Sequence, residues 1–115
     1  IIDIVQLHGS ESPEFCERIN ADRIKYFSPK DFQKIGEYDT EYYLFDSGTG
    51  TGNTFDWSKI PNTTVPFFLA GGINKTNIAD AIAKVNPYCI DLSSAVETDG
   101  KKDYNKIKEI MEIIR

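Results

Sequence analysis

The chain has 115 residues, which is the size of one domain and too short for two. Its composition, 40% hydrophobic and 27% charged, is globular, and no apolar run approaches the roughly 20 residues that span a membrane. A net charge of −5 without any basic block argues against nucleic-acid binding. Cys16 and Cys89 lack a CxxC motif and paired histidines, which excludes a disulfide framework and a zinc site and predicts reduced thiols in a cytoplasmic protein.

Five short apolar runs predict β-strands at residues 4–7, 24–27, 42–45, 67–70 and 89–92. Between the first two strands, Ser12 followed by Pro13 predicts the start of a helix. The inward face of this helix is predicted to carry Phe15, Cys16 and Ile19. After the second strand the helical pattern is weaker, with Phe32 and Ile35 inward.

Two clearer helical patterns follow in the second half of the chain. Asn74 is predicted to cap a helix that ends before Pro87 and has as inward residues Ile78, Ala81, Ile82 and Val85. The last helix is predicted from Asp103 to the end, with inward residues Ile107, Ile110, Met111 and Ile114. Strands alternating with helices predict an α/β protein with a parallel sheet. The pattern alone leaves open a five-stranded doubly wound sheet or part of a (β/α) barrel, since a closed barrel needs eight units.

Two carboxylates, Asp46 and Asp91, stand at or in predicted strands, and parallel α/β folds place their sites at the carboxyl ends of strands. Asp46 follows an apolar strand, surroundings that suit a carboxyl group to donate a proton near neutral pH. The alternative is an aspartate that only begins a loop, which spacing alone favours slightly. His8 ends the first strand, where a structural hydrogen bond is more common than catalysis.

An anion site is predicted where two later strands end. Gly71 and Gly72 lie between a strand and the helix capped by Asn74, so their amides could bind an anion, to which Ser93 and Ser94 could also donate. The alternative is equally open: glycines that only permit a turn and serines that only cap. The glycine-rich run at residues 48–52 matches no nucleotide motif and fits a flexible loop over a site.

Several motifs occur in order along essentially the whole chain: VQLHG at 5–9, LFDS at 44–47, GTGNTFDW at 50–57, FLAGGIN at 68–74 and IDLSSAVE at 90–97. In this order they resemble the phosphoribosylanthranilate isomerase family. The resemblance implies a parallel (β/α) barrel of TIM type. Residues 1–115 would form the C-terminal portion of this single domain and supply strands four to eight, with strands one to three absent.

The resemblance also implies an activity and a set of site residues. The family isomerises N-(5-phosphoribosyl)anthranilate, an aminoaldose, to a 1-deoxyribulose 5-phosphate aminoketose by an Amadori rearrangement in tryptophan biosynthesis. It uses no metal or redox cofactor, and its partner is a small phosphorylated substrate. Asp46 matches the general acid, and the phosphate-binding turns match Gly71, Gly72, Ser93 and Ser94. Lining the mouth of the site, with less defined roles, would be Gln6, His8 and Asp91.

Two parts of the family's pattern are absent from these 115 residues: the base, a cysteine in a Lys-Ile-Cys-Gly motif on the first strand, and an arginine after the second. Cys16 falls in a predicted helix and Cys89 at the start of a strand, so neither thiol can replace the base. Ala95 and Thr49 stand where the family usually has glycine. We therefore expect an inactive fragment that self-associates through open sheet edges, and the alternative function is a non-catalytic half-barrel that binds phosphate or assists assembly.

Overall fold

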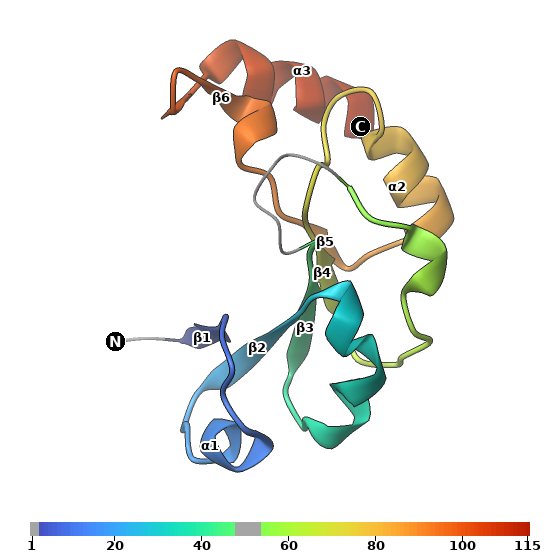
Figure 1. Cartoon of the computed structure of the whole chain (residues 1–115). Helices are drawn as coiled ribbons and strands as arrows, with labels where there is room; N and C mark the ends of the chain where they lie inside the picture. Colours follow the sequence, from blue (N-terminus) through green and yellow to red (C-terminus); the bar gives the residue numbers. More distant parts are fainter. Residues whose placement is uncertain (1–2, 48–53) are drawn as a thin grey trace.

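The computed structural model describes residues 3–47 and 54–115, and its centre is a parallel sheet of five strands (Figure 1). The strands are β1 (Ile4–Leu7), β2 (Asp22–Phe27), β3 (Tyr42–Phe45), β4 (Phe67–Leu69) and β5 (Cys89–Ile90). They lie side by side in the order of the sequence, so every crossover moves in the same direction. A doubly wound sheet reverses at a switch point, whereas a barrel does not. The strand order therefore favours the barrel type of winding.

The predicted strands are all present, with small corrections at their ends. The first and third have the predicted bounds, and β2 begins two residues earlier than predicted. β4 ends at Leu69 and β5 at Ile90, one and two residues earlier than predicted. Beyond each end one more ladder hydrogen bond forms, since Ala70 N–H donates to the Phe45 carbonyl and Asp91 N–H to the Leu69 carbonyl, both at 2.9 Å. After these two bonds the chain leaves the sheet, and the residues that follow form the loops of the site.

Helical segments and one short hairpin connect or follow the strands: α1 (Pro13–Glu17), η1 (Pro29–Glu37), η2 (Trp57–Lys59), α2 (Ile78–Val85), η3 (Ser94–Val96), β6 (Glu97–Thr98), β7 (Lys101–Lys102) and α3 (Tyr104–Ile114). Ser12 caps α1 as predicted, its Oγ accepting the Phe15 N–H at 3.1 Å. The cap of α2 is Asn77, and the prediction of Asn74 is wrong by three residues. Asn74 instead accepts the N–H of Thr76 at 2.9 Å and forms a turn just before the helix.

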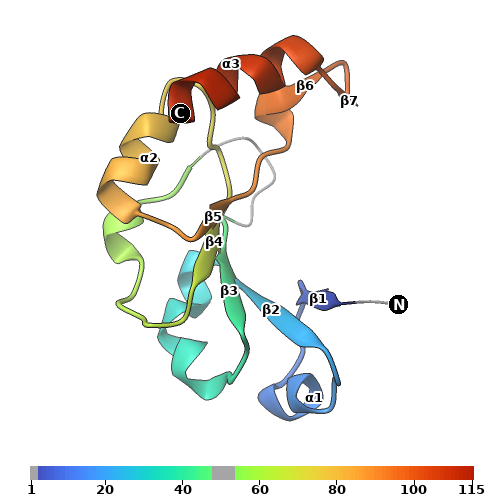
Figure 2. The same ribbon diagram turned by 180° about the vertical axis from the view of Figure 1, so that it is seen from behind.

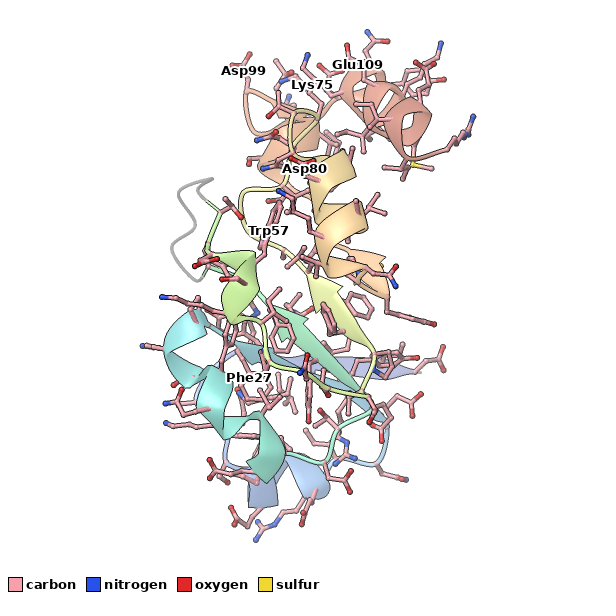
Figure 3. The ribbon with its side chains drawn as sticks, turned by 90° about the vertical axis from the view of Figure 1, so that its right-hand side faces the viewer. Phe27, Trp57, Lys75, Asp80, Asp99 and Glu109 are labelled. Carbon is pink, nitrogen blue, oxygen red and sulfur yellow. The ribbon has the colours of Figure 1, made fainter. Side chains whose placement is uncertain are left out.

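The main core lies between the sheet and the helices. One cluster joins the outer face of β2 and β3 to η1 through Phe27, Phe32, Tyr43 and Phe45, and Figure 3 shows Phe27 in the packed layer beside η1. A second cluster joins β4 to α2 and α3 and includes Leu69, Ile78, Ala81 and Ile110. Figures 1 and 2 show η1, η2 and α2 along one side of the strands. The opposite, inner face carries Ile24, Leu44 and Ala70, packed against Tyr26, Tyr42 and Phe68.

Several predicted inward residues are in fact exposed. Phe15 on α1 is 51% exposed, whereas Cys16 beside it is buried. On α2, Ile82 is exposed. On α3 only Ile110 of the predicted face is buried, and about two fifths of the side-chain surface is exposed at Ile107, Met111 and Ile114. Helical periodicity identifies an apolar face, but burial also needs a second element to cover it, and within the described residues Ile110 is the contact that packs α3 onto the core.

Both edges of the sheet are open in the part of the chain that the structure describes. β1 pairs only with β2, and β5 only with β4. Ile4 on β1 is 46% exposed, so this edge strand presents apolar surface. Of the helices in residues 3–47 and 54–115, none is long and apolar enough to cross a membrane.

Candidate functional site

A pocket of about 150 Å³ lies where β3, β4 and β5 end, and its lining includes Asp46, Ser47, Ala70, Gly71, Gly72, Ile73, Asp91, Leu92, Ser93 and Ser94. Parallel strands deliver their carboxyl ends to one edge of a sheet, so residues far apart in the sequence meet there. Six of the eight site residues predicted from the sequence line this pocket. The two that lie elsewhere are Gln6 and His8.

The glycine turn, defined as Gly71 and Gly72, follows β4 and adopts left-handed backbone, with φ angles of 89° and 71°. Residues other than glycine are strained in this region. A Cβ atom on Gly71 would also lie 2.6 Å from Asp46 Oδ1 and 2.8 Å from the Ser47 nitrogen. The turn therefore needs glycine for its conformation and for the close approach of the Asp46 carboxylate.

Two asparagines hold the glycine turn in place. The Asn77 side chain donates to the Gly72 carbonyl at 2.9 Å, and its Oδ1 accepts the Asn74 N–H at 2.8 Å. Asn74 Nδ2 also reaches the Gly72 carbonyl, at 3.4 Å. Asn77 therefore ties the turn to the beginning of α2. Asn77 is not among the residues predicted from the sequence. The signal that could have identified it is its position as a second asparagine three residues after Asn74, directly before the apolar helix.

The serine pair, defined as Ser93 and Ser94, lines the same pocket after β5, the strand next to β4, and both residues are exposed. Neither hydroxyl group has a hydrogen bond to another described residue, so both can donate to a ligand. Ala95, which differs from the family pattern, lies in η3. The non-glycine residues with positive φ, among those described, are Asn86 and Asp99. Ala95 therefore adopts ordinary backbone and does not strain this turn.

Asp46 lies between the glycine turn and the inner face of the sheet. Its N–H donates to the Phe27 carbonyl at 3.3 Å, which extends the pairing of β2 and β3 by one bond. Its Oδ1 accepts a hydrogen bond from the Ser47 hydroxyl at 3.3 Å. The preceding Phe45 is fully buried, whereas Asp46 itself is half-buried. Asp46 therefore follows a buried apolar residue but is itself partly accessible, an arrangement that suits proton donation to a bound ligand.

Gln6 and His8 lie at the end of β1, on the edge of the sheet. Gln6 Nε2 and His8 Nδ1 are 3.0 Å apart. The imidazole stacks on the Tyr26 ring, with centroids 4.1 Å apart and planes 13° from parallel. Burial, together with the negative charge of Asp46, raises the pKa of Tyr26. Tyr26 lies on β2, between β1, which His8 follows, and β3, which Asp46 follows. Tyr26 is not among the predicted site residues, because in the sequence it is only one position of an apolar strand.

Neither cysteine lines the pocket. Cys16 is buried in α1, where burial raises the pKa of its thiol. Cys89 is exposed and begins β5, at the end of the strand opposite to the pocket. Both positions agree with the expectation that neither thiol acts as the base. The predicted loop over the site, residues 48–52 with Thr49, lies outside the described residues.

A larger pocket of about 540 Å³ lies at the other end of the sheet, where β4 begins and α2 ends. Its lining includes Trp57, Phe67 and Lys84, and Figure 3 shows Trp57 in the region between η2 and α2. None of the predicted site residues lines this pocket. The smaller pocket is therefore the better candidate site, because it gathers carboxylates, hydroxyl groups and a glycine turn.

Comparisons with known proteins agree with this geometry. The family model of N-(5'-phosphoribosyl)anthranilate isomerase matches residues 1–113. The chain is 45% identical over 123 residues to the N-(5'-phosphoribosyl)anthranilate isomerase of Endomicrobium trichonymphae, covering 99% of this chain and 62% of that protein. It superimposes on the phosphoribosyl anthranilate isomerase of Thermus thermophilus with a TM-score of 0.81 and 28% identity, covering 98% of this chain and 60% of the other.

A further solved structure is phosphoribosyl anthranilate isomerase in complex with reduced 1-(o-carboxyphenylamino)-1-deoxyribulose 5-phosphate, with a TM-score of 0.70 and 30% identity, covering 96% of this chain and 58% of that one. The chain thus spans less than two thirds of the length of these relatives. The family model nevertheless matches residues 1–113 of the chain. The chain belongs to the N-(5'-phosphoribosyl)anthranilate isomerase family.

Proposed function

We propose that the protein containing this chain is an N-(5'-phosphoribosyl)anthranilate isomerase of tryptophan biosynthesis, and that β1 to β5 take the places of strands four to eight of its barrel. The single observation that carries the activity is the pocket in which Asp46 packs against the glycine turn and faces the serine pair. The rearrangement of a sugar phosphate needs a proton donor and groups that bind the phosphate, and this pocket brings both kinds of group to one edge of the sheet. The one-directional strand order supports the place in the barrel.

The proposed reaction begins with the substrate's phosphate bound between the glycine turn and the serine pair. Asp46 donates a proton to the furanose ring oxygen, the bond from that oxygen to C1 breaks, and the nitrogen lone pair forms a protonated Schiff base with C1. A base then removes the proton from C2, which gives an enamine. Proton return to C1 and loss of the C2 hydroxyl proton yield the aminoketose, so the reaction is a net isomerisation. The resemblance places that base in a motif absent from these 115 residues, and neither Cys16 nor Cys89 lines the pocket.

Substrate binding is supported by a relative, since a solved isomerase carries a reduced carboxyphenylamino deoxyribulose 5-phosphate. This ligand has a phosphate, a sugar chain and an aromatic amine. The pocket here supplies hydroxyl donors at Ser93 and Ser94 and a glycine turn of the kind that binds phosphate in many (β/α) barrels. We assign Asp91, which lines the same pocket from the end of β5, to the mouth of the site.

The test of the proposed function is turnover of N-(5-phosphoribosyl)anthranilate by the purified protein, compared with the variant Asp46→Asn. We expect kcat to fall by about 10²-fold or more, because the amide cannot donate the proton, and KM to change less. Asp80→Asn is the matched control, since Asp80 is an exposed carboxylate on α2 away from the pocket. An Asp46→Asn protein with near-normal turnover would move the acid role to another group.

The second candidate is a non-catalytic half-barrel that binds phosphate or assists assembly. It is favoured by one observation: the glycine turn and the serine pair, which supply groups that could bind an anion, line one pocket of the described residues. The mass of the intact purified protein and its phosphate affinity separate the two candidates. A mass of 13.0 kDa with phosphate binding and no turnover would support this second candidate, and turnover by the protein would exclude it.

Two further proposals concern its surroundings. We place the protein in the cytoplasm, on the basis that both of its thiols are unpaired. For the second candidate, the half-barrel alone, we also propose that copies pair through the sheet edges that are open in the described residues, since β1 exposes Ile4. Sedimentation should show an apparent mass that rises with protein concentration, and Ile4→Lys should reduce this rise. A concentration-independent monomer would refute this pairing.

A further inference from the structure

Two stacked rings lie beside the pocket and are not used by the proposed mechanism. The His8 imidazole lies flat on Tyr26, with ring centroids 4.1 Å apart and planes 13° from parallel. Tyr26 is half-buried on the inner face of β2, whereas His8 is exposed at the end of β1. Tyr26 is the one ring that contacts the imidazole within the described residues, and His8 is exposed, so the other face of the imidazole can take a planar ring.

The orientation of the imidazole is set by Gln6. Its Nε2 lies 3.0 Å from His8 Nδ1, and an amide nitrogen can only donate. Nδ1 is therefore the acceptor, and the neutral ring carries its proton on Nε2. Within the described residues this Nε2–H has no other partner, so it can donate to an acidic group on a ligand.

The stack has a defined place along the site. Tyr26 pairs in register with Leu44, two residues before Asp46, so β2 sets the rings beside the proposed proton donor. The Asp46 N–H donates to the carbonyl of Phe27, the residue after Tyr26, so Asp46 and Tyr26 lie close together on neighbouring strands. Along the edge of the sheet the order is therefore His8, Tyr26, Asp46, the glycine turn and the serine pair.

The proposed substrate has the same order of chemical groups. Its phosphate is at one end, its ribose is in the middle, and a benzene ring with an ortho-carboxylate is at the other end. With the phosphate at the glycine turn and the ring oxygen at Asp46, the benzene ring extends toward β2 and β1. A planar ring stacks favourably on another aromatic ring, and the ortho-carboxylate can accept the imidazole N–H.

This inference rests on the proposed function. We propose that Tyr26 is a specificity-determining residue, because it supports His8, and the His8 imidazole is the platform on which the aromatic ring of the substrate stacks. Tyr26 holds the imidazole flat, and His8 contacts the ligand. The pair selects amines that carry a planar aromatic acid over aliphatic amines of similar size.

The test uses the complete protein and two probes, anthranilate and inorganic phosphate, whose dissociation constants are measured directly by titration calorimetry. Tyr26→Leu removes the support and should raise the dissociation constant of anthranilate about 5-fold, the range of an aromatic pair, with no change for phosphate. Tyr26→Phe keeps the ring and should keep the anthranilate constant. Tyr42→Leu is the matched control, because Tyr42 lies on the same face of the neighbouring strand but near the opposite end.

A second variant keeps the test valid if Tyr26→Leu does not fold. His8 is exposed, so His8→Ala should fold and should weaken anthranilate by a similar factor without affecting phosphate. Equal weakening of both probes, or an equal effect of Tyr42→Leu, would overturn the assignment. If the wild-type protein turns over the substrate but neither Tyr26→Leu nor His8→Ala weakens anthranilate binding, only this inference fails. If anthranilate binding depends on the rings but there is no turnover, the proposed isomerase activity fails and the platform stands.

Discussion

Replacing Gly71 by alanine tests whether the glycine turn positions the Asp46 carboxylate. The new Cβ would lie 2.6 Å from Asp46 Oδ1, whereas ordinary contacts begin at 3.4 Å, so the carboxylate must move by about 0.8 Å. A displacement of about 1 Å at a catalytic group costs on the order of 10²-fold in rate. We therefore expect kcat to fall by about 10²-fold.

The same change also strains the backbone, because Gly71 has a φ of 89°. Left-handed backbone costs a non-glycine residue about 1–2 kcal/mol, and the reduced entropy of the unfolded chain offsets about 0.4–1 kcal/mol of this. The free energy of unfolding should therefore fall by about 1 kcal/mol, in addition to the effect of the contact. This loss must be separated from the effect on the carboxylate.

Gly100 provides the matched control. Its φ is 77°, but a Cβ there would meet nothing within 4 Å. Gly100→Ala should therefore cost about 1 kcal/mol of stability and leave kcat unchanged. The assay is steady-state turnover together with urea unfolding of both variants and the wild-type protein. Normal kcat in Gly71→Ala, or an equal loss of kcat in Gly100→Ala, would refute the reasoning.

Three further predictions concern a bound anion, an ion pair and a buried hydrogen bond. Crystals soaked in phosphate or sulfate should show one anion between the glycine turn and the serine pair, and an anion bound elsewhere would contradict the assignment. The hydrogen bond from Arg23 lowers the pKa of Glu41 below its ordinary 4.5. Glu41→Gln should therefore destabilise the protein at pH 7 in urea unfolding, and the difference should shrink as the pH falls below 4.5. The buried hydroxyl of Tyr43 donates to the Ile35 carbonyl at 3.1 Å. Tyr43→Phe should lower the unfolding free energy by about 1 kcal/mol, and an unchanged value would show that this bond contributes nothing.

Helix faces show where sequence reasoning reaches its limit. The periodicity of α3 correctly identified an apolar face, yet of its residues only Ile110 is buried. Lys25 shows the reverse case, since this charged residue lies in a predicted apolar strand and is buried. Its Nζ donates to the Gly9 carbonyl at 2.8 Å and lies 3.4 Å from a Glu11 carboxylate oxygen. Both outcomes depend on which distant segment covers a residue, and local patterns carry no information on that.

The sequence by itself determined the elements and the edge that holds the site. Apolar runs located five strands, Ser12 and Asp103 marked helix starts, and the residues after the strands included Asp46, the glycine turn and the serine pair, which line one pocket. These are local properties, since strand burial, capping and turn conformation depend on neighbours in the chain. The closeness of Gly71 to Asp46 and the stack of Tyr26 on His8 were decided only by the tertiary structure. The physical reason is that each contact joins two strands, and the register between those strands sets which side chains meet.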